Sequence, residues 1–305
     1  MQKTGGGTFD PSVEHLYFLA ANMERLRHVQ ALRPNLLIAV NELQSAESSN
    51  ELDEFLDAGI TVFLDSGIYN LAMEHARKHG TTHDAALGLA PDEIDGFYDL
   101  WERYLTLVER YGDRLWGYIE LDQGGRENKI KTRAKLESLG LRPIPVYHPL
   151  NDGWDYFDEL ARNYDRICFG NIVQADPGTR KRLLATAWER RRDYPDLWIH
   201  LLGMRPNQVL HAYPVNSADA STWLSAVRWS GYVESANGTT MGGLPKHFQY
   251  RLGSDPEAPH GNQKAARMAA FGGMLVERNW LGHLDEMRDL GMDERGGSYQ
   301  GAISK

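Results

Sequence analysis

Acidic residues and glycines follow several short apolar runs of this sequence. Asp65, Ser66 and Gly67 come directly after "ITVFL", Asp122 follows "YIEL", and Asp219 follows "NSA". Acids at the ends of three different strands, beside glycines that let a ligand approach the backbone closely, suit the binding of a planar polar ligand. The spacing therefore predicts a pocket in which carboxylates do the chemistry.

Further polar or small residues occupy the same position after other runs: His148, Gly170 with Asn171, and Gly203. Each has a simpler explanation when taken alone. An aspartate after a strand is commonly the N-cap of the next helix, His148 could be a structural histidine, and Tyr69 could pack in the core. Because the carboxyl ends of parallel strands open on one face, the set is better explained together, as one site.

Apolar runs and amphipathic segments alternate along most of the chain, and they must position these residues. We expect strands at 36–40, 60–64, 115–121, 143–147, 166–170, 197–203 and 212–218, and helices near 48–57, 92–111, 126–139, 152–163, 177–193 and 220–229. The runs are mostly continuous rather than alternating, as in parallel sheets buried on both faces. The pattern predicts an α/β fold, either a (β/α) barrel or a doubly wound sheet. The connection at 69–91 is long and is interpreted as a lid.

We expect a single domain in three parts. Residues 1–35 form an N-terminal arm, 36–235 the barrel core, and 236–305 an irregular segment followed by a C-terminal helix at about 262–290. The segment at 236–262 is rich in Gly, Pro and Asn and carries Lys246, His247 and Arg251, which suggests a loop that faces nucleic acid.

Composition excludes several classes of protein. The formal net charge of −9 argues against a strongly basic nucleic-acid binder. Two basic runs, at 126–142 and 180–193, are either solvated helix faces or patches that face phosphate. The single cysteine, Cys168, excludes a disulfide framework and a cysteine-based zinc cluster, and indicates a reducing, cytoplasmic location. No apolar run is long enough for a membrane span, so we expect no membrane partner.

Six segments in order resemble the tRNA-guanine transglycosylase superfamily, most closely its short phage-type members that insert 7-deazaguanine bases into DNA (DpdA-like proteins). They are "FLDSGIY" (63–69), "YIELD" (118–122), "IPVYH" (144–148), "ICFGN" (167–171), "HLLGM" (200–204) and "NSADASTW" (216–223). The resemblance covers about residues 36–230. It implies an irregular (β/α)8 TIM-type barrel, here with a C-terminal irregular and helical extension, in the host-cell cytoplasm if the chain is phage-encoded.

The resemblance also implies a role for each matched residue. Asp219 matches the nucleophile that attacks C1′ of the target nucleoside, and Asp65 matches the acid/base group that deprotonates the incoming base. Asp122 matches the acid that reads the purine edge. The remaining base-pocket positions are Ser66, Gly67, Tyr69, His148, Gly170, Asn171, Leu202 and Gly203, with Tyr69 and Leu202 on the two faces of the base.

Two departures from the family pattern bear on the substrate. Members that act on tRNA carry a zinc site built from three cysteines and a histidine, which this chain cannot form. His148 and Asn171 stand where the tRNA enzymes have glutamine and glycine. This second departure bears on base specificity. The missing zinc site favours DNA rather than tRNA as the partner, and we expect a free 7-deazaguanine base and no cofactor. The expected backbone contacts are Arg180, Lys181, Arg182, Lys246 and Arg251.

Three other functions are compatible with the sequence. The chain could be a tRNA-guanine transglycosylase that acts on RNA. It could be a metal-dependent barrel hydrolase whose ligands come from Asp65, Asp122, His148, His200 and Asp219, although His200 lies within a strand with two leucines after it, which counts against its reaching the mouth. It could also be a nucleic-acid-binding subunit without catalysis, but the presence of both Asp65 and Asp219 argues against that.

Overall fold

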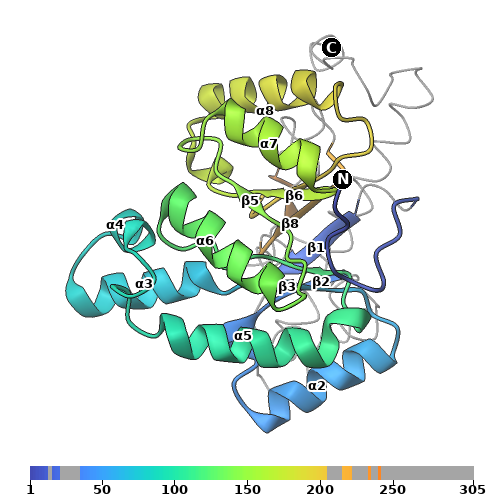
Figure 1. Ribbon diagram of the computed structural model, residues 1–305, viewed down its shortest axis with the longest axis vertical. Helices are drawn as coiled ribbons and strands as arrows, with labels where there is room; N and C mark the ends of the chain where they lie inside the picture. The colour runs from blue at the N-terminus through green and yellow to red at the C-terminus, as the bar shows by residue number, and fades with distance from the viewer. Residues whose placement is uncertain (13–15, 21–34, 205–214, 222–232, 235–239, 242–305) are drawn as a thin grey trace.

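Eight parallel strands form the centre of the molecule in a computed structural model of residues 1–305 (Figure 1). The structure describes residues 1–12, 16–20, 35–204, 215–221, 233–234 and 240–241. The strands follow the order β4-β3-β2-β1-β8-β7-β6-β5. A parallel bridge between Ile119 and Ile144, with the hydrogen bond from Ile144 N to Tyr118 O at 2.8 Å, joins the two outer strands. The sheet therefore closes as an irregular TIM-like barrel, and the doubly wound alternative is wrong.

The strands of the barrel are short. They are β1 (Leu16–Ala20), β2 (Asn35–Ala39), β3 (Val62–Asp65), β4 (Gly117–Tyr118), β5 (Val146–Tyr147), β6 (Arg166–Phe169), β7 (Trp198–Leu201) and β8 (Ser217–Ala220). The α-helices of the described residues are α2 (Ala46–Asp57), α3 (Ile68–His79), α4 (His83–Gly88), α5 (Phe97–Tyr111), α6 (Gly125–Ser138), α7 (Trp154–Asn163) and α8 (Pro177–Arg191). A separate small ladder joins β9 (Val233–Glu234) to β10 (Thr240–Met241).

β1 lies inside the segment that we expected to be an arm, so that part of the prediction is wrong. Its central residues are fully buried, and it pairs with β2 on one side and β8 on the other. Phe18 stands opposite both Asn35 and Asp219. The barrel needs this strand because without it β2 and β8 would each leave an unpaired edge. The expected helices at 220–229 and 262–290 lie outside the described residues.

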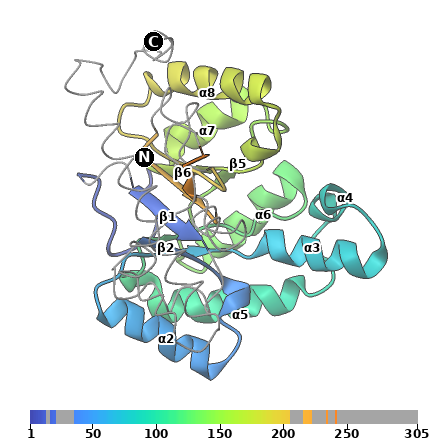
Figure 2. The same ribbon diagram turned by 180° about the vertical axis from the view of Figure 1, so that it is seen from behind.

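The helices lie outside the strands (Figures 1 and 2), and α2, α4 and α8 begin at a residue whose side chain caps the helix. Ser45 forms a capping box with Ser48 at the start of α2, and Asp176 caps α8 ahead of Pro177. The expected lid at 69–91 contains α3 and α4, which extend away from the barrel in both views. None of the described helices has the length and apolarity to cross a membrane.

Two apolar clusters hold the barrel. The larger one packs the strands against the helices, and the smaller one fills the barrel interior around Phe18, Phe63, Trp116 and Trp198. Aromatic ring centroids within the inner cluster lie 4.8–5.8 Å apart, in edge-to-face or tilted pairs. Because side chains fill the barrel interior, a ligand-binding site is expected at the carboxyl ends of the strands.

Candidate active site

Three carboxylates meet at the carboxyl ends of the strands. Asp65 is the last residue of β3, Asp122 follows β4, and Asp219 lies within β8. Their proximity is evident from electrostatics, because the charges of Asp122 and Asp219 both raise the pKa of Asp65. The structure thus places Asp122 and Asp219 near Asp65, and the roles expected of the three acids stay predictions.

Asp65 has a strongly raised pKa. Burial, followed by the charges of Asp122 and Asp219, raises its pKa from 3.8 to about 7, against the opposing effect of the backbone N–H groups of Gly67 and Ser66. A carboxyl group with this pKa can both give and accept a proton near neutral pH, as an acid/base catalyst requires.

The contacts of Asp219 with described residues are made by one of its two carboxylate oxygens. Its Oδ1 accepts from the backbone N–H of Gly203 at 3.1 Å and lies 3.1 Å from Nε2 of His200. No hydrogen bond from a described residue reaches Oδ2. Among the described residues, one carboxylate oxygen of Asp219 is thus anchored and the other is not.

His200 reaches the site, contrary to the expectation from its place within the strand. The Asp219 carboxylate only accepts, so Nε2 of His200, 3.1 Å from Asp219 Oδ1, carries the imidazole proton. Nδ1 then accepts from the Ser217 hydroxyl at 2.8 Å, and the same hydroxyl accepts from the indole Nε1–H of Trp198 at 2.7 Å. In a parallel barrel β7 and β8 are neighbours, so inward-pointing residues of the two strands meet inside.

A second buried series of hydrogen bonds fixes the orientation of the His148 ring. The ammonium group of Lys129 donates to Asp152 Oδ2 at 2.6 Å and to Val146 O at 3.0 Å, and it lies 3.4 Å from Nδ1 of His148. Because an ammonium group only donates, Nδ1 accepts and Nε2–H of His148 points to Asp122 Oδ2 at 3.1 Å. The imidazole and Asp122 therefore form one hydrogen-bonding edge at the mouth.

Two glycines are required for this geometry. A methyl group on Gly170 would lie 2.5 Å from the ring of His148, so a larger residue would displace that ring. Gly67 has φ of +82° and faces the side chain of Asn41, where any Cβ would clash. The Oδ1 atom of Asn41 is buried without a hydrogen-bond partner among the described residues, which makes it a further candidate contact for a ligand.

The other predicted pocket residues differ in burial and in their contacts. Ser66 is buried, Tyr69 is 58% exposed with its ring 4.4 Å from that of His83, and Leu202 packs against the interior cluster. The amide of Asn171 is occupied by the loop after β5, where it donates to Asn151 and accepts from Leu150 N at 3.4 Å. Asn171 therefore has a structural role in addition to any contact with a base.

The basic runs are less available than the sequence suggested. Arg180 donates to the backbone carbonyls of Ile172, Val173 and Ala175, so its guanidinium group is used within the fold, whereas Lys181 and Arg182 are exposed. Lys246 and Arg251 lie outside the described residues.

In the first run, Lys129 and Arg133 are buried on the inner face of α6. The interpretation of that run as a solvated face or a phosphate patch is wrong for these two residues, because each pairs with a buried acid.

The sequence interpretation missed several members of the site: Asn41, Lys129, Asp152 and Ser217. Helical spacing could have indicated Lys129 and Arg133, which lie four residues apart on one face of α6. The five residues considered as hydrolase metal ligands do not bring three ligand atoms within 4.8 Å of one another.

Comparison with known proteins adds little to this geometry. No family model matches the chain, and no curated protein sequence matches it. A solved structure described as "Structural study of Project ID from Aquifex aeolicus VF5" is similar to it, with 11% identity, a TM-score of 0.49, and coverage of 89% of this chain and 94% of that one.

Proposed function

We propose that this protein is a base-exchange transglycosylase that replaces guanine in DNA with a 7-deazaguanine derivative. The observation that carries the proposal is the pairing of two unlike carboxyl groups at one mouth. Oδ1 of Asp219 is anchored by His200 and Gly203, Oδ2 accepts no hydrogen bond from a described residue, and Asp65 has a pKa of about 7. Covalent exchange at a sugar carbon needs such a pair, one group to attack and one to move protons.

In the proposed reaction, a target guanine is flipped out of the stack into the mouth of the barrel. Oδ2 of Asp219 attacks C1′, the C1′–N9 bond breaks, and Asp65 gives its proton to the departing guanine. The incoming 7-deazaguanine base then loses its N9 proton to the Asp65 carboxylate and attacks C1′, which releases Asp219. Proton and charge are restored at the end of the cycle, so no cofactor is consumed.

The second polar edge supplies recognition in this proposal. Nε2–H of His148 already donates to Asp122, and the Asp122 carboxylate can accept from the N1–H and exocyclic amine of a guanine-type base. Tyr69 is exposed beside Asp65 and offers a ring face for the base. The preference for DNA over tRNA rests on the single cysteine of the chain, since the zinc site of the tRNA-acting relatives would need more.

Mass spectrometry of nucleosides tests the proposal. The full-length protein is incubated with candidate 7-deazaguanine bases and either DNA or tRNA, and the digested nucleosides are analysed. We expect a modified deoxynucleoside from DNA and, after denaturation, a covalent protein–DNA adduct. Asp219→Ala should abolish both, while Asp92→Asn, at an exposed acid outside the mouth, should leave both unchanged. An Asp219→Ala protein that still exchanges bases would overturn the assignment, and modification of tRNA alone would move the substrate to RNA.

A further inference from the structure

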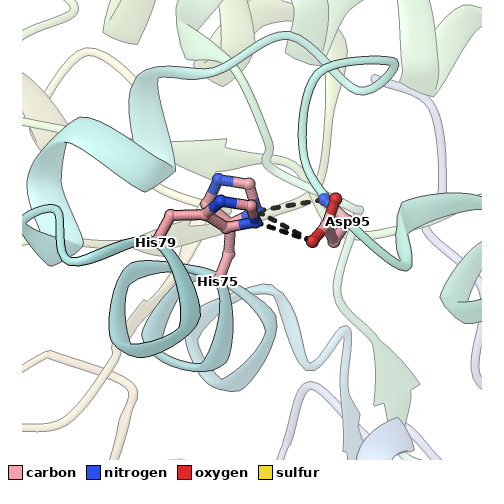
Figure 3. Close-up of side chains that lie close together, drawn as sticks. All are labelled: His75, His79 and Asp95. Atoms are coloured by element: carbon pink, nitrogen blue, oxygen red, sulfur yellow. Dashed lines mark hydrogen bonds and ion pairs between the residues drawn. The ribbon is translucent and has the colours of Figure 1, made fainter.

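A second group of polar side chains lies away from the mouth, where the C-terminal half of α3 meets the segment ahead of α5. His75 and His79 are one helical turn apart on α3, and both imidazoles point at Asp95 (Figure 3). The distance from His79 Nε2 to Asp95 Oδ2 is 2.8 Å, and from His75 Nδ1 to the same oxygen it is 4.0 Å. The three candidate ligand atoms lie within 4.8 Å of one another, and among the described residues no other group of His, Cys, Asp and Glu meets this criterion.

We propose that His75, His79 and Asp95 bind a divalent transition metal, with Zn²⁺ as the preferred ion, and that the metal joins α3 to the segment before α5. Two imidazoles and one carboxylate form a donor set that suits zinc, which takes nitrogen and oxygen ligands at about 2.0–2.2 Å. Two histidines at i and i+4 on one helix face present their rings to the same point. Small side-chain rotations would bring the three atoms to tetrahedral separation, with water in the fourth position.

The tautomer of His75 favours this role. The backbone N–H of Asp95 donates to Nδ1 of His75 at 3.1 Å, so Nδ1 carries the lone pair and Nε2 the proton. A metal would use the same lone pair and would break the hydrogen bond from the Asp95 N–H group. The ring of His75 is mostly buried and stacks near that of His79, with centroids 4.3 Å apart, so its orientation is restricted before any ion binds. Preorganisation of this kind lowers the cost of binding.

Lys78 is the competitor in this site. Its ammonium group lies 2.6 Å from Asp95 Oδ2, the same oxygen that His79 contacts. A bound Zn²⁺ would displace the ammonium group, and both groups are exposed enough for Lys78 to turn into solvent. The competition gives the proposal a specific signature, because removal of the lysine should strengthen metal binding rather than weaken it.

The position of the site suggests what the metal does. α3 begins directly after Asp65, Ser66 and Gly67, and the segment before α5 closes the excursion through α4. An ion at this point would fix the end of α3 that lies away from the mouth. The proposal is independent of base exchange, since none of its ligands belongs to the candidate active site.

Competition titration of the metal-stripped, full-length protein with Zn²⁺ and a chromophoric chelator tests the site. We expect one equivalent to bind, with affinity reduced at least about 100-fold in His79→Ala and Asp95→Ala, because even outer-shell partners of a metal site contribute 10–100-fold. Both residues are exposed, and circular dichroism should confirm that the variants fold. His83→Ala, at a nearby histidine outside the group, should bind as the wild type does, and Lys78→Met should bind more tightly.

Substitution with Co²⁺ supplies a second readout. Visible absorption typical of a tetrahedral ion with nitrogen ligands should appear with the wild type and be absent from His79→Ala. Wild-type and His79→Ala proteins that bind Zn²⁺ equally well would overturn the proposal. It would also be overturned by a wild type that binds no tighter than the His79→Ala Asp95→Ala double variant.

Discussion

At the scale of single residues, the site depends on where protons sit. Asp65 has a folded-state pKa of about 7, above its ordinary value of 3.8. The protonated form therefore favours folding, an effect that is complete below pH 3.8 and is lost as the pH rises to about 7. Above that pH, the folded protein must hold a buried charge beside Asp122 and Asp219.

Asp65→Asn should remove this cost, because the amide stays neutral and can still accept from the N–H groups of Ser66 and Gly67. We expect the variant to be more stable than the wild type by about 2 kcal/mol at pH 8, with the difference shrinking toward pH 4. Urea denaturation at both pH values measures it. Asp92→Asn is the exposed control, and an equal difference at both pH values would contradict the assigned pKa.

His200 is a positioning residue for Asp219 in the proposed reaction. His200→Phe removes the Nε2–H group and should lower the rate of exchange roughly 10–100-fold, the loss expected for one hydrogen bond to a charged group. Ser217→Ala leaves the ring in place but frees its tautomer, so we expect a smaller loss. Single-turnover trapping of the covalent adduct separates this effect from DNA binding; unchanged adduct formation in His200→Phe would exclude the role.

At the scale of elements, one buried side chain helps to attach the excursion through α3 and α4 to the barrel, beside the core contacts of Leu71, Ala72 and Ala86. Nε2 of Gln123 donates to the carbonyl of Ala86 at 2.8 Å and to that of Leu89 at 2.7 Å. These bonds hold the end of α4 against the strand end that carries Asp122. The excursion therefore owes its position to side-chain contacts as well as to its own helices.

Gln123→Glu should loosen this attachment more than Gln123→Ala does. The alanine loses the donor and leaves a small cavity, at a cost of about 1–3 kcal/mol, whereas the glutamate turns a carboxylate toward carbonyl oxygens. Limited proteolysis should then cut faster within 80–96. Equal cutting rates in the wild type and both variants would show that other contacts hold the segment.

At the scale of the whole molecule, the N-terminal segment closes the barrel at the end opposite the site. Arg166 is buried in β6 and donates to Thr4 Oγ1, Gly5 O and Trp116 O at 2.5–2.6 Å, with its guanidinium carbon 4.0 Å from the ring centroid of Phe9. Burial lowers its pKa to about 10, so it stays charged at neutral pH. A charge in this position needs the first nine residues as partners.

Deletion of residues 1–9 should destabilise the protein by about 3–5 kcal/mol, since it leaves this charge without most of its acceptors. Arg166→Met in the shortened chain should recover part of the loss. Thermal unfolding of the four proteins in this cycle measures the coupling. Additive effects of the deletion and the substitution would show that Arg166 and the segment act independently.

The sequence by itself determined an α/β fold with a parallel sheet and indicated which acids follow its strands, while the choice of a barrel came from the family resemblance. Continuous apolar runs indicated parallel strands. Parallel strands all end at the same side of the sheet, so the acids that follow those runs were expected on one side of it. β1 was missed although Leu16–Ala20 is an apolar run like the others.

Tertiary structure alone decided the rest. The contacts of His200 with Asp219 and Ser217, and of Lys129 with Asp152, span 17 to 23 residues, and whether such side chains meet depends on strand register and on which helix face is buried. The raised pKa of Asp65 likewise depends on folding, which buries this carboxyl group and brings the charges of Asp122 and Asp219 near it. Local sequence specifies the groups, and the fold sets the distances between them.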